Sequence, residues 1–433
     1  MVEYTDVANT GIAWLPQIPQ HWKVRKLKYA FDERSDKGYP DEPLLVSSQN
    51  MGVVLKSVYG KRTVEALKDL DKLKLVKVGD YVVSLRSFQG GIEYAYYQGI
   101  ISPAYTIMEP HKDCKSDYYK FLLKSAPFIK LLTTCVTGIR EGQNVDYKKL
   151  RNVEIPIPPR AEQEQIVRFL DWKVSKINKK VALKRRSLDL IKELINSAFA
   201  ALVENKAEIV RLKRVVSLEN DYIEINPDES YRKAGMYNRG RGIFLRDAVS
   251  GKEMGDSKFQ RIHSGRLMLS GQFAWEDAVF VTSFKDEEGV ASHRYYLLKS
   301  ENKDVPVEYL FGYFISQKGF TDLQQCSHGS AGRNRPLNIN ELLRIEIPIV
   351  HNPESIRKLC NLVQVYMTMR PLVLHEEEIL DELRNRIISD VVTGKIDVRN
   401  VTIPEYEHID DIYDDNNEGS EETDETETDG EEA

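Results

Sequence analysis

The residues of this chain that are best suited to chemistry are arginines and side-chain amides in short polar stretches that contain glycine. Arginine can bind O6 and N7 of guanine, and asparagine or glutamine can bind N6 and N7 of adenine. Neighbouring glycines would let the backbone approach a phosphate closely. Each stretch alone also fits an ordinary exposed loop. The candidate DNA-binding residues are Arg86, Gln89, Arg140, Gln143, Asn144, Arg239, Arg241, Arg333, Asn334 and Arg335.

Catalytic motifs are absent from the sequence. Neither Gly60-Lys61 nor Gly394-Lys395 follows a glycine at the spacing of a phosphate-binding loop. The eight histidines never form an HxH or HExxH pattern, so we predict no metal site and no catalytic residues. We therefore expect a chain that binds and does not catalyse. Two alternatives stay open, a duplicated nuclease with an unrecognised site and a coiled-coil scaffold that does not bind DNA.

The sequence consists of two diverged copies of one unit of about 190 residues. Ser102–Tyr105 returns as Ser292–Tyr295, and Leu150–Ile157 returns as Leu342–Ile349. An ordered series of matches with a slowly growing offset is hard to obtain by chance. The arginine and amide stretches of the two copies are interpreted as matching loops, which strengthens each of them. Duplication gives a chain approximate two-fold symmetry, which suits duplex DNA.

A long amphipathic helix is predicted after the first copy. Pro158-Pro159 cannot continue a helix, so the helix begins just beyond them. Apolar residues then recur at spacings of three and four from Val167 to Leu202. The second copy has a corresponding segment, 354–392, in which Pro371 should kink or break the helix. Because an isolated heptad helix is unstable in water, we predict that the two helices pair; an exposed charged linker helix is the alternative.

Charge is segregated along the chain. The 433 residues include 61 Lys or Arg and 67 Asp or Glu, for a net charge of −6. Residues 404–433 contain 15 of the acids and no Lys or Arg, so the other 403 residues carry a net charge of +9. We predict that this acidic end is disordered and solubilising. Mimicry of DNA or binding of a partner is the alternative.

Length and composition indicate the class of protein. A chain this long predicts two or three domains. No run of 18 apolar residues exists and the N-terminus lacks a signal pattern, so we predict no membrane contact. The cysteines stand far apart without a CxxC pair, which predicts free thiols in a reducing cytoplasm. They are Cys114, Cys135, Cys326 and Cys360.

In three places the sequence resembles the specificity subunits of type I restriction-modification enzymes. The segment 155–171 is similar to the start of the first conserved helix of that family. The segment 379–399, with its Thr-Gly-Lys-Ile-Asp-Val-Arg ending, is similar to the end of the second conserved helix. Residues 14–24 are similar to the usual opening, and the resemblance spans residues 12 to about 400. The chain departs from the family at 350–355, where a Pro-Pro and Glu-Gln signature is usual.

The resemblance implies an α+β fold. It implies two similar mixed α/β target-recognition domains separated by two long helices that pack as an antiparallel coiled coil with pseudo-two-fold symmetry. The helices would fix the spacing between the domains. The expected parts are a first target-recognition domain at 1–157, a first long helix at 158–206, a second target-recognition domain at 207–350, a second long helix at 351–403, and an acidic disordered tail at 404–433.

The same resemblance implies a role in DNA recognition. The chain would be the specificity subunit of a type I complex and would read a bipartite, asymmetric target in double-stranded DNA, one half per domain. Two modification subunits would carry S-adenosylmethionine and methylate adenine. Restriction subunits would carry out ATP-driven translocation and cleavage with Mg. The chain itself would bind none of these cofactors and would be non-catalytic, as one part of a type I deoxyribonuclease and adenine methyltransferase complex.

Overall fold

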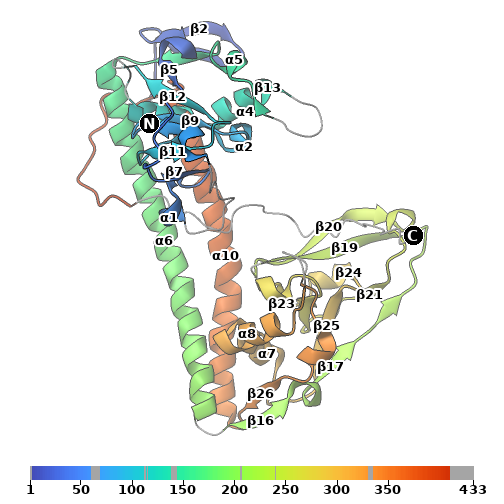
Figure 1. Cartoon of the computed structure of the whole chain (residues 1–433). Helices are drawn as coiled ribbons and strands as arrows, with labels where there is room; N and C mark the ends of the chain where they lie inside the picture. The colour runs from blue at the N-terminus through green and yellow to red at the C-terminus, as the bar shows by residue number, and fades with distance from the viewer. Residues whose placement is uncertain are drawn as a thin grey trace. The chain divides into compact units, whose positions relative to one another are not determined.

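The computed structural model divides the chain into two compact units (Figure 1). The first unit contains residues 1–181 and the segment that begins at Glu378, and the second contains Ala182–Glu377. Two long helices, α6 (Arg160–Glu204) and α10 (Pro353–Val392), each contribute to both units. Over the residues described, no helix has the length and apolar character needed to cross a membrane. The structure describes residues 2–59, 69–111, 114, 116–137, 144–204, 207–238, 240–329 and 335–409.

The first unit is built on a four-stranded antiparallel sheet. Its strand order is β10-β9-β12-β5. The central strand β9 is buried along its whole length, which explains why the run Tyr-Val-Val has no polar residue. The ring of Tyr81 packs edge-on against Phe31, which in turn packs against Tyr119 on the covering helix α3. The bounds are β5 Phe31–Arg34, β9 Tyr81–Val83, β10 Glu93–Tyr94, β12 Thr106–Pro110 and α3 Ser116–Leu122.

Smaller elements surround this sheet. They form two-stranded antiparallel pairs, β2 with β3, β4 with β15, β6 with β7, β8 with β11, and β13 with β14. The strands are β2 Val7–Ile12, β3 Leu15–Pro19, β4 Lys23–Lys26, β6 Leu45–Ser48, β7 Gly52–Leu55, β8 Lys74–Val76, β11 Gly99–Ile101, β13 Val136–Thr137, β14 Asn144–Val145 and β15 Glu154–Ile157. The helices are α1 Lys56–Tyr59, α2 Ser87–Gly90, α4 Ala126–Thr134 and α5 Tyr147–Leu150.

The second unit repeats the same sheet. Its strand order is β17-β25-β22-β23, so β22 takes the place of β9 and β25 takes the place of β12. Helix α7 carries the matching aromatic residues over this sheet, with Tyr309 and Phe311 fully buried. The duplication predicted from the sequence is therefore present in the fold. The bounds are β17 Val216–Glu219, β22 Leu267–Ser270, β23 Val279–Val281, β25 Tyr295–Ser300 and α7 Val307–Ile315.

The second unit also has a five-stranded sheet of order β18-β21-β24-β19-β20. Its β19–β20 hairpin is long and contains a bulge between Arg232 and Ala234. The strands are β18 Tyr222–Ile223, β19 Ser230–Tyr237, β20 Gly242–Ser250, β21 Phe259–Arg261 and β24 Gly289–Ser292. The remaining elements are β16 Glu208–Arg211, which pairs with β26 Glu346–Ile349, and the helices α8 Gln317–Gln325 and α9 Ile339–Leu342.

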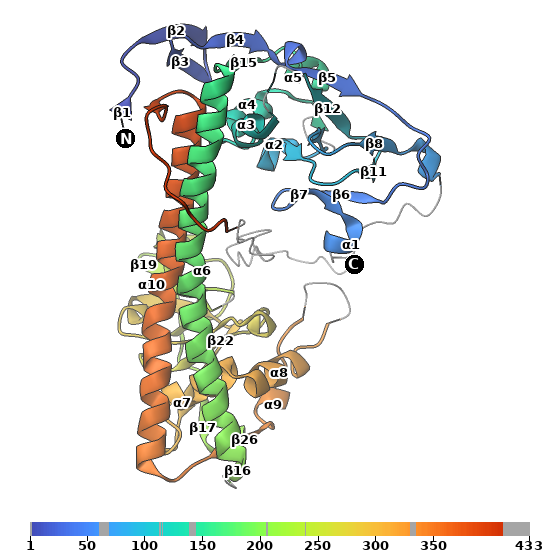
Figure 2. The same cartoon turned by 90° about the vertical axis from the view of Figure 1, so that its left-hand side faces the viewer.

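The two long helices pack against each other in an antiparallel manner (Figures 1 and 2). In the first unit, Ile177 near the middle of α6 shares a core with Ile387 near the end of α10. In the second unit, Phe199 near the end of α6 shares a core with Val363 near the start of α10. The early part of one helix thus meets the late part of the other. The predicted coiled coil is confirmed.

Of the kink or break predicted at Pro371, the break does not occur, because α10 continues from Pro353 to Val392 with Pro371 inside it. A proline removes one backbone hydrogen bond and crowds the preceding turn. Buried residues on both sides, Tyr366 and Val373, hold the helix in its packed position. Burial of each such side chain contributes about 1.5–3 kcal/mol, which offsets a defect confined to one turn.

The end of α10 joins the first unit through a glycine stop. Gly394 has a φ of +75°, and its N–H donates to the carbonyl of Val391, as expected for a helix C-cap. The chain then forms β27 (Ile396–Asp397), which pairs with the N-terminal strand β1 (Val2–Glu3). The segment that follows α10 therefore meets the N-terminal strand within the first unit.

The substitution Gly312→Ala should destabilise the second unit by roughly 1–3 kcal/mol, the usual cost of overpacking a core. A Cβ atom at this position of α7 would lie 2.6 Å from Cγ2 of Val363 and 3.3 Å from the ring of Phe199. Helix α7 would have to move away from both long helices. Urea unfolding measures the loss of free energy. The double variant Gly312→Ala/Val363→Ala removes the opposing methyl group and should be less destabilised than the two single losses added together; simple additivity would contradict this explanation.

Candidate nucleic-acid interface

Arg86 and Gln89 lie at a tight turn after strand β9, and both side chains are exposed. Hydrogen bonds to the buried Ser87 hold the backbone of this turn. The N–H of Ser84 donates to Oγ of the buried Ser87 at 2.9 Å, and the N–H of Gly91 donates to the carbonyl of Ser87. Gly91 has a φ of +89°, a conformation that favours glycine. The backbone is therefore held while the two predicted side chains point outward.

Asn144 lies beside this turn, because β14 contacts α2 in the fold. Asn144 is exposed and begins the second strand of the short β13–β14 hairpin. The structure thus brings together two stretches that are far apart in the sequence. The predicted residues Arg140 and Gln143 lie outside the described residues.

A buried ion pair supports the first loop cluster. The ammonium group of Lys124 lies 2.7 Å from both carboxylate oxygens of Glu93, and it also donates to the carbonyl of Gln49 at 2.5 Å. Glu93 follows the Gly91 turn by two residues and is almost fully buried. Burial raises the pKa of Glu93 to about 7, and the positive charge of Lys124 acts against this rise. The pair ties the turn to the short connection between α3 and α4.

In the second unit, Arg241 lies at the turn of the β19–β20 hairpin. Its guanidinium lies over the ring of Tyr237, 4.9 Å from the centroid, and donates to Oδ1 of Asn238 at 3.2 Å. The amide of Asn238 in turn donates to Glu276 at 2.7 Å. The hairpin turn is thereby tied to the short helix η5 (Ala274–Glu276). Arg239 lies outside the described residues.

Arg335 meets the same short helix from another segment. It is exposed, and its guanidinium lies 5.0 Å from the centroid of the Trp275 ring. Stacking on an aromatic face orients a guanidinium group and leaves its N–H edge able to bind. Helix η5 therefore gathers Arg241, through Asn238, and Arg335. The neighbouring predicted residues Arg333 and Asn334 lie outside the described residues.

The interpretation of the two arginine turns as matching loops is wrong. The Arg86 turn follows β9, and the matching strand β22 is followed by Gly271 and η5, whereas Arg241 belongs to a hairpin of the other sheet. The sequence offset between matching segments of two diverged copies cannot reveal a sheet that was added to one copy. Trp275 was missed for this reason. A signal was available, because Trp275 comes shortly after Ser270, which matches Ser84 of the first copy.

Helix α10 contributes a further arginine to the second cluster. Arg370 donates to Asp277 at 3.1 Å, and its guanidinium lies over the ring of Tyr366, 5.5 Å from the centroid. Gly240 has a φ of +60°, and a Cβ atom there would collide with this guanidinium. The turn that carries Arg241 therefore needs a glycine so that the hairpin and the helix can approach each other.

Comparison with known proteins finds relatives of this chain. The family model described as the type I restriction modification DNA specificity domain matches residues 19–191. The type I restriction enzyme MjaVIII specificity subunit of Methanocaldococcus jannaschii is 24% identical over 431 residues, which cover 89% of this chain and 95% of the relative. A solved chain from work on complex assembly and conformational transition of the type I R-M system has a TM-score of 0.53 at 14% identity, covering 88% of this chain and 99% of that chain.

Residues 19–191 thus match the DNA specificity domain of type I restriction-modification enzymes, and the chain is similar over most of its length to a specificity subunit of that class. The resemblance seen in the sequence is therefore confirmed, and the solved chain supports the predicted fold class. Subunits of this family are non-catalytic in themselves. Consistent with a binding role, the two loop clusters present guanidinium and amide groups, which recognise bases and phosphates.

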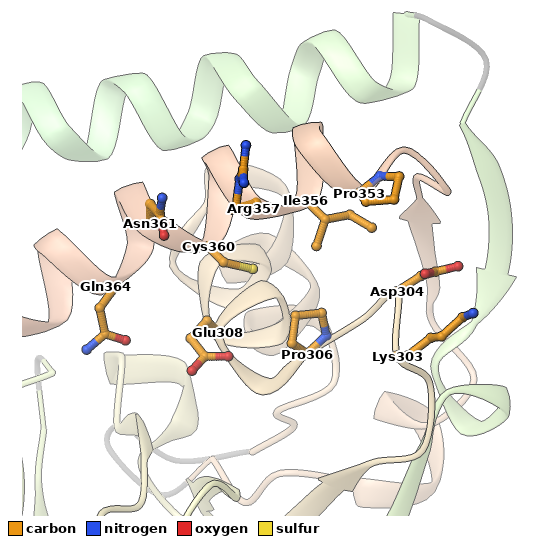
Figure 3. A pocket seen from close by; sticks show the side chains of 10 residues that line it. All are labelled: Lys303, Asp304, Pro306, Glu308, Pro353, Ile356, Arg357, Cys360, Asn361 and Gln364. Carbon is orange, nitrogen blue, oxygen red and sulfur yellow. The ribbon is translucent and has the colours of Figure 1, made fainter.

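One cavity of the second unit lies away from the loop clusters (Figure 3). It has a volume of about 450 Å³ and lies between the first turns of α10 and the start of α7. Figure 3 shows Ile356 and Cys360 of α10 facing Pro306 and Glu308. None of the described candidate DNA-binding residues lines it. Within the described part of the chain, no group of three or more His, Cys, Asp or Glu side chains is placed to hold a metal ion.

The substitution Glu93→Gln should change how the stability of the protein depends on pH. Since the pKa of Glu93 is raised from 4.5 to about 7, the folded chain keeps a proton that the unfolded chain has lost between these values. The contribution of Glu93 to the free energy of unfolding is therefore largest below about pH 4.5 and falls as the pH rises to about 7. The glutamine variant lacks this fall, so it should gain stability relative to the wild type across that window.

Urea unfolding at pH 5, 6, 7 and 8 measures this difference. The same substitution at the exposed Glu33 is the matched control for the loss of one carboxylate. A constant gap between the Glu93→Gln variant and the wild type over the whole range would show that Glu93 does not titrate in this window.

Proposed function

We propose that this chain chooses the DNA sequence on which a type I restriction-modification complex acts. The observation that carries the proposal is that each unit combines one copy of the repeated sheet with a cluster of arginine and amide side chains. Arg86, Gln89 and Asn144 form the first cluster, and Arg241 and Arg335 belong to the second. Each cluster would read one half of a bipartite target in double-stranded DNA.

The two halves of the target should differ in sequence. The first cluster combines one described arginine with two amides, whereas the second presents arginines held on the rings of Tyr237 and Trp275. The second unit also has a five-stranded sheet in addition to the repeated one. Different side chains at the two clusters read different bases, so the target is asymmetric.

The helix pair would set the spacing between the halves. Helix α6 is 45 residues long and α10 is 40 residues long, and each is continuous. Side-chain pairs lock their register, including Arg185, which meets Glu377 through two hydrogen bonds of 3.1 and 3.2 Å. A helical pair of fixed register is a rigid spacer, and half-sites read by one protein lie near one turn of DNA apart.

Partner subunits would supply the chemistry. Modification subunits would bind S-adenosylmethionine and methylate adenine, and restriction subunits would use ATP and Mg to translocate and cleave DNA. The helix pair offers a surface for such partners. On α10, Val365 and Leu372 are exposed at a spacing of seven, and on α6 Leu183, Leu190 and Leu194 are exposed. Exposed apolar residues at heptad spacing are typical of a face that another helix covers.

The substitutions Arg86→Ala and Arg335→Ala should each impair one half of the target only. Loss of a base contact costs roughly 1–3 kcal/mol and relaxes the choice of base at that position.

The measurement is binding of the reconstituted complex to duplexes in which one half of the target or the other is altered. Mapping of methylated adenine in the host, with and without this gene, identifies the target. A methylation pattern that does not change when the gene is deleted contradicts the proposal, and uniform weakening on all sequences would assign these arginines to phosphate.

The substitution Leu372→Glu should weaken assembly with the modification subunit by about tenfold or more, because it places a charge in an apolar contact. The isolated chain should unfold as the wild type does, since Leu372 is 61% exposed. Thr368→Glu, at an exposed polar position of the same helix, is the matched control. Native mass spectrometry of the mixed subunits measures assembly. Equal assembly of both variants would place the partner on another surface.

A further inference from the structure

The chain that follows α10 lies along the outer face of α6 as an extended segment, residues 398–409, which we call the strap (Figure 2). At its start, Nε2 of Gln165 donates to the carbonyls of Val398 at 3.0 Å and Val401 at 2.8 Å. Gln165 is only 9% exposed. A buried amide requires hydrogen-bond partners, and the backbone of the strap provides them.

The far end of the strap is held by two more polar side chains of α6. Ser175 Oγ donates to the carbonyl of Glu407 at 2.9 Å and accepts from the N–H of Ile409 at 2.6 Å. Asn178 donates to the carbonyl of Ile409 at 3.2 Å. Ser175 and Asn178 are 2% and 3% exposed. The strap therefore runs in the same direction as α6 and is a built part of the first unit.

The strap fixes where the acidic end of the chain begins. Residues 410–433 contain 13 Asp or Glu and no Lys or Arg. A segment of 24 residues can reach at most about 80 Å from its origin beside Asn178, since an extended chain spans about 3.3–3.6 Å per residue. Within the strap, Glu407 pairs with Lys179 of α6 at 2.9 Å. Lys176 and Lys180 of the same helix are exposed.

We propose that the strap and the acidic end form an intramolecular competitor for nucleic acid, a proposal that rests on the DNA-binding role above. The strap holds the start of the acidic end, residues 410–433, on α6. The carboxylates of the acidic end occupy cationic surface of the folded chain in place of DNA phosphates. Tethering gives the carboxylates a local concentration in the millimolar range. The body they compete for carries a net charge of +9 over residues 1–403.

This competition weakens sequence-independent DNA binding more than sequence-specific DNA binding. Sequence-independent binding depends almost entirely on phosphate contacts and on counterion release, which a nearby polyanion opposes. Specific binding adds base contacts that a carboxylate cannot replace. The acidic end therefore raises the ratio of specific to non-specific affinity, and it does so most strongly at low salt.

The test compares the full chain with a chain that ends at Ile409, each assembled with modification subunits. Affinity is measured for a random-sequence duplex and for the methylated-motif duplex, between 50 and 300 mM KCl. The shortened chain should bind the random duplex about tenfold more tightly at 50 mM, with the gap closing as salt rises. Its affinity for the motif duplex should change less. Equal affinity of both chains for the random duplex would overturn the proposal.

Two full-length variants separate the effect of the acidic charges on DNA binding from the effects of chain length and of anchoring on α6. The first replaces the 13 acids after Ile409 with Asn or Gln, and it should bind as the shortened chain does; binding like the wild type would also overturn the proposal. The second, Ser175→Ala/Asn178→Ala, keeps the acids and removes two anchors, so it should give an intermediate affinity. If no chain distinguishes the motif from random DNA, the proposed function fails, while the random duplex still reports on the competitor.

Discussion

The burial of one apolar face on each of the two long helices is the contact on which the rest of the structure depends. Because α6 and α10 both pass through both units, neither unit has a core made only from its own copy of the repeat. The first core contains Val181 of α6 and Leu380 of α10, and the second contains Ile195 and Leu359. Ion pairs such as Arg185 with Glu377 add specificity of register more than stability, since partly exposed pairs contribute about 1 kcal/mol or less.

The first unit is completed by the N-terminal segment and by the segment that follows α10. Glu162, in the first turn of α6, is 6% exposed and accepts hydrogen bonds from the hydroxyl of Tyr4 and from Nε1 of Trp22 at 2.9 Å, and His21 lies 2.7 Å from it. A buried carboxylate is costly unless several donors satisfy it. The N-terminal segment thereby closes over the start of α6, next to the β1–β27 pair. The strap continues this closure along the same helix.

The parts that the sequence predicted are those governed by local rules. Matching segments in the two copies predicted a repeated unit, and apolar spacing predicted the paired helices. Pro371 misled because its local penalty is small beside the packing of a 40-residue helix. The second loop cluster misled because η5, the β19–β20 turn and Arg335 meet only through tertiary contacts. The offset between matching segments of the two copies carries no information on such tertiary contacts.

The construction of the second cluster suits base recognition better than general attraction to phosphate. Arg241 and Arg335 are oriented by the aromatic rings beneath them, which lowers the entropy lost when a guanidinium binds a base edge. Glu276 and Asp277 lie among these arginines, with Asp277 bound to Arg370, so the positive potential of the cluster is partly cancelled. A phosphate backbone responds to potential, whereas a guanine edge responds to the placement of two N–H groups. Arginines that are rigid and partly neutralised therefore keep most of their affinity for a guanine edge, while their attraction to the phosphate backbone is reduced. The acidic end of the chain acts in the same direction by a different route.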